Sequence, residues 1–464
     1  MELDRIIRSG DVVTQGGVRR MDIGIRGGKI AALAERLDET RADAVLDAGG
    51  MLVMPGMIDA HVHLNEPNMG HWEGFETGSA ALAAGGCTAY LDMPLNGNPP
   101  TVTTEALRLK ASLAEGRSRV DYGFWGGLVP GNLDQLKPLA DAGVTAFKAF
   151  ISNPGGEGEG RFRQVDDWTL YEGMKRIASF GGLLALHAES DSITAALTEA
   201  AGAEGRAGAR DYAASRPVVA ELEAVNKALL FAELTGCRLH FVHISSASAA
   251  GRIAAARERG LDVTAETCPH YLLLTEDDME RLGPVAKCAP PLRSADERAA
   301  LWKAVEGGMI DLIASDHSPC PTPLKTAAAS FFAAWGGISG AQSSLELMLS
   351  EGVIRRGWSP VTVADLTARK PAERFGLGGR KGRIATGYDA DLALVDMRHP
   401  YTLHEEQLLY RHKHSPYAGM TIGCKVAATI CRGEIVYRSG SGPESDATET
   451  AYEHGKRIWP IASP

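Results

Sequence analysis

Two histidines separated by one residue close an apolar run near the start of the chain. The segment G-M-I-D-A-H-V-H ends in His61 and His63. Side chains two positions apart on a β-strand point to the same face, so both imidazoles can reach one metal ion. Exposed or hydrogen-bonded structural histidines are the alternative, but an H-x-H pair at the carboxyl end of a buried strand favours a metal site.

A lysine lies inside a second apolar run, V-T-A-F-K-A-F. Phe147 and Phe150 flank Lys148, which argues against a solvated surface lysine. An unpaired ammonium in apolar surroundings costs on the order of several kcal/mol, unless its pKa falls and the amine becomes neutral. A neutral amine reacts with CO2 to give a carbamate, whose two oxygens can bridge two metal ions. We therefore expect CO2 to carboxylate Lys148.

Three further candidate ligands each end an apolar run of their own. His187 ends G-G-L-L-A-L-H, His243 ends L-H-F-V-H, and Asp316 ends I-D-L-I-A-S-D. Together with the three residues above, they place six candidates on five predicted strands, all at the strand end where barrel active sites form. This pattern predicts a metal centre rather than a set of unrelated structural residues.

Charge accounting favours two divalent cations rather than one. Two such ions carry four positive charges, of which a carbamate, Asp316 and a bridging hydroxide remove three. Metal binding lowers the pKa of water from about 15.7 toward 7, which is the chemistry of a hydrolase. Nitrogen and oxygen ligands without thiolate admit Zn2+, Co2+, Mn2+ and Fe2+ alike, and we expect Zn2+ among them.

Eight apolar runs alternate with helical stretches between residues 55 and 377. The expected strands cover residues 57–63, 87–93, 120–125, 145–150, 183–187, 239–243, 263–267 and 312–316. Amphipathic or Ala-rich stretches such as 76–84, 105–113 and 217–234 separate them. Alternating β/α units predict a closed parallel α/β barrel of the TIM type, (β/α)8, whose strand ends carry the candidate ligands.

Short β-strands are expected at both ends of the chain. Because chain termini often meet in space, we expect residues 1–54 and 378–440 to form one small β-sandwich domain beside the barrel of residues 55–377. The remaining residues, 441–464, are expected to form a poorly ordered C-terminal tail.

Composition bounds the partners and the compartment. The 464 residues include 48 Lys and Arg against 58 Asp and Glu, a net charge of −10 that argues against nucleic acid or an anionic membrane as partner. Seven cysteines without metal-finger spacing are typical of a reduced, cytoplasmic protein. The charged start M-E-L-D-R-I-I-R does not resemble a signal peptide, and no apolar run is long enough to span a membrane.

These motifs together resemble the amidohydrolase superfamily, in its cyclic-amidase branch of dihydroorotases, hydantoinases (dihydropyrimidinases) and allantoinases. The resemblance extends from P-G-M-I-D-A-H-V-H to K-G-R-I-A-T-G-Y-D-A-D-L. It implies that His61, His63 and Asp316 hold a first metal ion, that His187 and His243 hold a second, and that carboxylated Lys148 bridges both. It also implies that Asp316 takes a proton from the bridging hydroxide and delivers it to the leaving ring nitrogen.

Differences between the branches indicate the substrate. Dihydroorotases carry H-x-H-x-R, whose Arg grips a substrate carboxylate, whereas Asn65 stands at that position here. Hydantoinases usually place a Tyr a few residues after the Lys, whereas F-K-A-F-I-S-N-P-G-G has none. Segments such as H-W-E-G-F-E-T-G and S-D-H-S-P-C-P are similar to the allantoinase family, which implies hydrolysis of the uncharged ring of allantoin to allantoate in purine degradation.

The same resemblance suggests substrate contacts and an assembly. Asn96 and Ser318 would supply polar partners for the ring and the ureido arm, and Phe150, Trp72 and Trp335 would form apolar walls or lids. Relatives are commonly tetramers, so a homotetramer is expected. The alternatives are a hydantoinase or dihydropyrimidinase acting on other cyclic ureides and, because some relatives have lost their ligands, a non-catalytic assembly protein.

Overall fold

The strands of the protein form a closed barrel and an adjoining open sheet. The computed structural model describes residues 2–155, 161–440 and 454–460. The barrel strands are β6 (Met57–Val62), β7 (Cys87–Asp92), β8 (Asp121–Phe124), β9 (Gly126–Gly127), β10 (Phe147–Phe150), β11 (Leu183–His187), β12 (Arg238–Phe241), β13 (Val263–Thr267) and β14 (Leu312–Ile313). All of their pairings are parallel.

Hydrogen bonds between neighbouring strands close the barrel into a ring. β9 continues the path of β8 and pairs with β10, with Lys148 opposite Gly127. The ring closes between the residues that follow β14 and those of β6, where Val62 pairs with His317 and the His63 N–H donates to the His317 carbonyl at 2.8 Å. The predicted (β/α)8 barrel is therefore confirmed, with β10, β12 and β14 shorter than expected.

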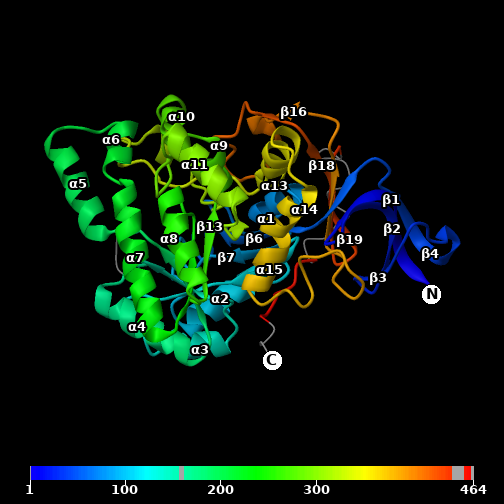
Figure 1. Ribbon diagram of the computed structural model, residues 1–464, viewed down its shortest axis with the longest axis horizontal. Helices are drawn as coiled ribbons and strands as arrows, with labels where there is room; N and C mark the ends of the chain where they lie inside the picture. The colour runs from blue at the N-terminus through cyan, green and yellow to red at the C-terminus, as the bar shows by residue number, and fades with distance from the viewer. Residues whose placement is uncertain (1, 156–160, 441–453, 461–464) are drawn as a thin grey trace.

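Helices surround the barrel on its outer side (Figure 1). The longer ones are α1 (Phe75–Ala84), α2 (Thr104–Ala114), α4 (Asp167–Ser179), α5 (Asp191–Ala203), α7 (Val218–Thr235), α8 (Ala247–Glu258) and α11 (Ala295–Glu306). Side chains fix where several of them begin, since Thr103, Asp166 and Ser246 each accept a bond from a backbone N–H of the first turn. Gly236, in the left-handed conformation with φ of 69°, ends α7.

Shorter helices occupy the remaining connections of the barrel. They are α3 (Leu136–Asp141), α6 (Ala209–Ala214), α9 (Pro269–Leu273), α10 (Glu276–Leu282), α12 (Pro323–Thr326), α13 (Ser344–Met348), α14 (Pro360–Ala364) and α15 (Lys370–Arg374). No helix among the described residues has both the length and the apolar character needed to cross a membrane.

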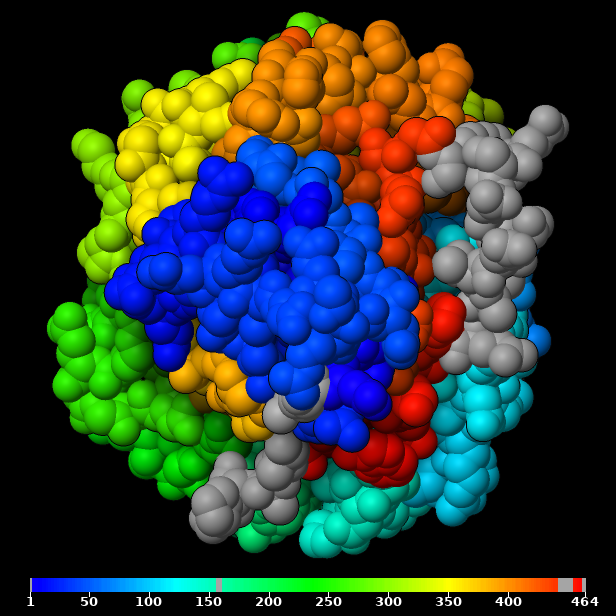
Figure 2. Space-filling model, turned by 90° about the vertical axis from the view of Figure 1, so that its right-hand side faces the viewer, coloured from blue at the N-terminus to red at the C-terminus, as the bar shows by residue number. Residues whose placement is uncertain are grey.

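The two ends of the chain meet in one eight-stranded, mostly antiparallel sheet, as the sequence predicts. Its strands are β1 (Leu3–Thr14), β2 (Gly17–Arg26), β3 (Lys29–Ala34), β4 (Ala42–Asp47), β5 (Leu52–Pro55), β15 (Leu392–Asp396), β18 (Lys425–Cys431) and β19 (Glu434–Arg438). β5 joins the two ends by pairing with β1 on one side and β15 on the other. Figure 2 shows the blue N-terminal residues framed by the orange and red C-terminal ones.

Part of the C-terminal segment lies against the barrel, so the expectation of a poorly ordered tail is wrong for residues 454–460. The Tyr122 N–H on β8 donates to the Lys456 carbonyl at 3.0 Å, and the Ile458 N–H donates back to Tyr122 at 2.8 Å. Ile458 is buried in the apolar cluster inside the barrel. Burial of this apolar side chain stabilises the ordered position of the stretch. Residues 441–453 and 461–464 lie outside the described residues.

A buried cluster of charges joins the barrel to the open sheet. Lys381 is fully buried, and its Nζ lies 2.7 Å from Asp121 on β8, 2.7 Å from Asp391 and 3.2 Å from Asp389. Arg432, 3.0 Å from Asp121, adds a second cation. Burial lowers the pKa of Lys381, but the surrounding carboxylates outweigh it and raise the pKa well above its usual value.

We expect Lys381→Met to lower the free energy of unfolding by about 3–5 kcal/mol, because it leaves buried carboxylates without their central cation. Denaturant-induced unfolding followed by circular dichroism measures the change. The matched control is Lys29→Met, whose ammonium is largely exposed at 3.7 Å from Asp389 and should contribute about 0–1 kcal/mol. Equal stabilities of the two variants would contradict the role of the cluster.

Candidate metal centre and active site

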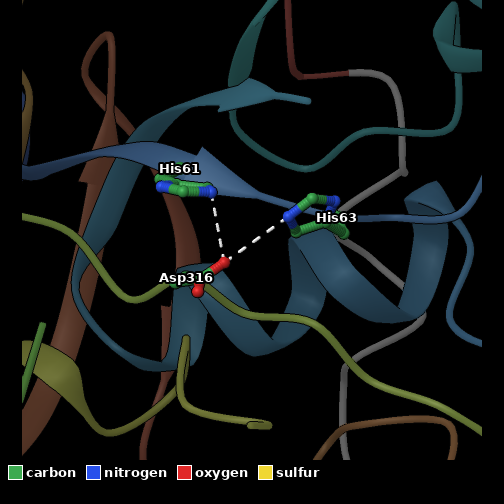
Figure 3. Close-up of side chains that lie close together, drawn as sticks. All are labelled: His61, His63 and Asp316. Carbon is green, nitrogen blue, oxygen red and sulfur yellow. Dashed lines mark ion pairs between the residues drawn. The ribbon is translucent and has the colours of Figure 1, made fainter. Parts of the chain in front are cut away.

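Three side chains converge at the carboxyl end of the barrel. His61 is the penultimate residue of β6, His63 directly follows that strand, and Asp316 follows β14. Asp316 Oδ1 lies 3.1 Å from His61 Nε2 and 3.4 Å from His63 Nε2 (Figure 3). Donor atoms of all three lie within 4.8 Å of one another, an arrangement suited to a single metal ion.

Two further histidines face each other beside this cluster. His187 ends β11 and His243 follows β12, and His187 Nδ1 lies 3.1 Å from His243 Nε2. The His243 ring is 5.5 Å from that of His61, so the two groups of donors adjoin. His243 and Asp316 have φ of 40° and 46°, a left-handed backbone that non-glycine residues seldom adopt.

Lys148 reaches the same region from the middle of β10. Its Nζ is completely buried, has no hydrogen-bond partner among the described residues and lies 5.0 Å from the Phe150 ring. Burial lowers the pKa of Lys148 to about 8, and Asp316 and Glu266 only partly oppose the shift. A buried amine without a partner in this position fits a carboxylated lysine, because the carbamate would add two oxygens that can bind metal ions.

Three imidazoles of the cluster favour their neutral form. Burial lowers the pKa of His63, of His187 and, most strongly, of His243. Burial alone would raise the pKa of Asp316, but His61, His63 and His243 outweigh it and hold the carboxyl well below its usual range. Neutral imidazoles and an ionised carboxylate are the protonation states that metal binding requires.

Two buried carboxylates behind the histidines orient their rings. His61 Nδ1 donates to Glu266 Oε1 at 2.8 Å, and His187 Nε2 donates to Glu189 Oε2 at 2.8 Å. These bonds leave His61 Nε2 and His187 Nδ1, the atoms that face the other donors, with free lone pairs. Burial raises the pKa of Glu266, but His61 and His240 outweigh it and lower it to about 2.

The sequence analysis does not single out Glu266, which lies in the segment E-T-C-P-H-Y. The signal available in the sequence was a carboxylate next to the end of a predicted barrel strand. Glu189, two residues after His187, is likewise buried, and it also pairs with Arg216 at 2.5 Å.

A cavity of about 440 Å3 opens above the donor atoms. Four of the five residues expected to contact substrate line it: Asn96, Phe150, Ser318 and Trp335. The Asn96 amide lies 3.2 Å from His63 Nδ1, and the Phe150 ring stacks on that of His187 at 4.5 Å. Both residues therefore contact candidate ligands as well as the cavity.

Trp72 differs from its prediction, because it does not line the cavity. Its ring packs edge to face on the Trp335 ring, with the ring centres 4.8 Å apart. Trp335 lines the cavity, and Trp72 contacts Trp335 without lining the cavity itself. Sequence reasoning also missed Tyr212, Arg216 and Lys287, which line the outer part of the cavity. They come from segments far from the metal-ligand motifs, and no local pattern marks them.

The family model and the most similar relatives of this chain point to one enzyme family. Residues 52–436 match the Amidohydrolase family. An allantoinase from Deinococcus radiodurans is 50% identical over 440 residues, covering 95% of this chain and 96% of its own. An allantoinase from Rubrobacter xylanophilus is 48% identical over 457 residues, covering 98% and 99%.

Solved structures extend the likeness to three dimensions. An L-hydantoinase (dihydropyrimidinase) from Arthrobacter aurescens has a TM-score of 0.92 at 35% identity, covering 98% of this chain and all of its own. A dihydropyrimidinase from Brevibacillus agri has a TM-score of 0.89 at 31% identity, covering 99% of this chain. The chain is therefore similar over its whole length to enzymes that open cyclic amides.

We expect Glu266→Gln to weaken zinc binding about 10–100-fold, because the amide no longer holds the His61 ring as a carboxylate does. Competition with a chromophoric chelator measures the affinity. Glu258→Gln, at an exposed position on α8, is the control and should bind zinc like the parent chain. Unchanged affinity in Glu266→Gln would contradict the orienting role.

Proposed function

The chain belongs to the amidohydrolase family, and on that premise we propose that it hydrolyses the hydantoin ring amide of allantoin to allantoate, a step of purine catabolism. The observation that carries the proposal is the 45–50% identity to several allantoinases over nearly the full chain. The hydantoinases among the solved structures are only 29–35% identical, which places them further away.

The side chains at the barrel mouth fit two divalent metal ions. His61, His63 and Asp316 would hold the first, His187 and His243 the second, and Lys148, carboxylated by CO2, would bridge them. The close approach of His187 and His243 and the orphaned Lys148 amine support this assignment. We propose Zn2+ as the metal, with Co2+, Mn2+ or Fe2+ as alternatives. Bound ions would supply a water of lowered pKa and polarise the ring carbonyl.

Asp316 has the position of a proton carrier. Its Oδ1 faces the two histidine nitrogens, which leaves Oδ2 to accept a proton and pass it to the leaving ring nitrogen. The side chain keeps 14% of its surface exposed, whereas that of His61 keeps 1%. Asp316 can thus reach both the buried donors and a molecule in the cavity.

The cavity walls suit an uncharged ring with a polar arm. We propose that Asn96 and Ser318 bond the amide groups of allantoin, while Phe150 and Trp335 pack on its faces. Asn65, where dihydroorotases carry Arg, is buried and donates to the Asn96 carbonyl at 3.3 Å. That position therefore supports Asn96 and offers no cation for an anionic substrate.

Steady-state assays on allantoin, hydantoin, dihydrouracil and dihydroorotate test the substrate. We expect kcat/KM for allantoin to exceed that for each of the others by at least about 100-fold, since the polar arm adds contacts that the simpler rings lack. Faster turnover of hydantoin would indicate the hydantoinase alternative. No turnover and no bound metal after expression with metal and bicarbonate would indicate an assembly protein.

We expect Lys148→Ala to lose nearly all activity and most bound metal, because no other described side chain brings a bridging acid to this place. Short carboxylic acids such as acetate or propionate should restore part of both by occupying the space of the carbamate. Activity and metal content per chain are the measurements, with Lys175→Ala on the exposed face of α4 as control. Retained activity in Lys148→Ala would exclude the bridging role.

We further propose that the protein is a homotetramer in the cytoplasm. All seven cysteines are free and buried, which suits a reducing compartment. Sedimentation equilibrium tests the tetramer.

A further inference from the structure

One wall of the cavity is a segment without regular secondary structure. We call residues 331–337, F-F-A-A-W-G-G, the wall loop; it lies between α12 and α13. Phe332, Ala334 and Trp335 are among its residues that line the cavity. A loop that shapes a binding site needs contacts that fix its backbone, because an unrestrained backbone costs about 1–2 kcal/mol per residue to order.

Two buried lysines hold this backbone through hydrogen bonds to its carbonyls, and Lys287 also lines the cavity. Lys287 Nζ donates to the carbonyls of Phe332 at 2.8 Å and Ala334 at 2.6 Å. Lys325 Nζ donates to the carbonyls of Trp335 at 2.8 Å and Gly337 at 2.7 Å. Four carbonyls of a seven-residue loop therefore accept bonds from two side chains that are only 4% and 3% exposed.

These ammonium groups are unusual because carbonyl dipoles take the place of a counter-ion. Among the described residues, no carboxylate forms an ion pair with either lysine. Lys287 instead lies 4.6 Å from the Tyr212 ring and 5.8 Å from that of Phe331. Burial lowers the pKa of Lys287 to about 7 and that of Lys325 to about 8. The positive charge of Lys325 also contributes to the lowered pKa of Lys287.

The bonds to the loop backbone also hold the Trp335 side chain in position. Its Nε1 donates to the Ser318 carbonyl at 3.1 Å, and Trp72 packs edge to face behind it. Gly337 allows the close approach, because a Cβ there would lie 2.4 Å from the Ser318 carbonyl oxygen. The indole thus has one position at the wall as long as the backbone on either side of it is held.

We propose that Lys287 and Lys325 are positioning residues that clamp the wall loop, so that Trp335 is preorganised to bind the part of the substrate that does not react. The proposal rests on the proposed function for the identity of that substrate. The candidate metal-ligand side chains lie at the ends of barrel strands, and among the described residues none of their hydrogen bonds or ion pairs involves Lys287, Lys325 or the wall loop. Loss of the clamp should therefore weaken substrate binding and leave the chemical step nearly unchanged.

Hydrogen–deuterium exchange tests the clamp without reference to activity. In Lys287→Met and in Lys325→Met, amides of the wall loop should exchange at least about tenfold faster than in the parent chain, while peptides of β6 and β11 exchange as before. In the parent chain the wall loop should exchange more slowly than the exposed residues 204–207. Exchange of the loop at the rate of those residues would overturn the proposal even if neither variant folds.

Steady-state kinetics on allantoin give the second readout. Each variant should raise KM about tenfold or more, with kcat within about threefold and metal content unchanged. Lys287→Arg, which keeps donor groups on the side chain, should recover part of the affinity, and Lys303→Met, exposed on α11, is the control. A fall in kcat with unchanged KM would overturn the proposal.

The two experiments separate this inference from the proposed function. A parent chain that does not turn over allantoin would refute the proposed function, while the exchange measurement would still decide whether the lysines clamp the loop. Normal turnover with unaltered exchange in both variants would refute the clamp alone.

Discussion

Six side chains with donor atoms are crowded at the carboxyl ends of the barrel strands, and their proximity is costly unless cations lie among them. His187 Nδ1 and His243 Nε2 are 3.1 Å apart, and Lys148 Nζ is buried with no hydrogen-bond partner in the described part of the chain. Neutral imidazoles, an ionised Asp316 and an amine of lowered pKa are the states in which these groups can share metal ions. The barrel holds them in place because each sits at or just beyond a hydrogen-bonded strand.

Buried charges outside the donor set give the site its rigidity. Glu266 and Glu189 fix the tautomers of His61 and His187, and Glu189 is in turn paired with Arg216 at the edge of the cavity. On the far side of the barrel, Lys381 and its aspartates join β8 to the open sheet. Each of these groups would be expensive to bury alone, so each constrains its partners to one geometry.

The cavity has two halves with different chemistry. The half that we call inner carries the candidate metal-donor atoms, whereas the half that we call outer is lined by Tyr212, Lys287 and the wall loop. Strands supply the inner half, and their backbone is held by the barrel itself. The outer half is built from connections, whose backbone is held by side chains such as Lys287 and Lys325. The candidate donor atoms and the loop wall of the cavity are thus supported by different parts of the fold.

The sequence by itself determined the barrel, the meeting of the two chain ends and the candidate donors, because strand periodicity and residue types such as H-x-H are local properties. Only the tertiary structure decided which groups stand behind and around them. Four contacts join segments that are distant in the chain: Glu266 with His61, Lys287 with the wall loop, Trp72 with Trp335, and Ile458 with the apolar cluster inside the barrel. Contacts of this kind depend on how helices and loops pack around the barrel, and no pattern within a short segment encodes them.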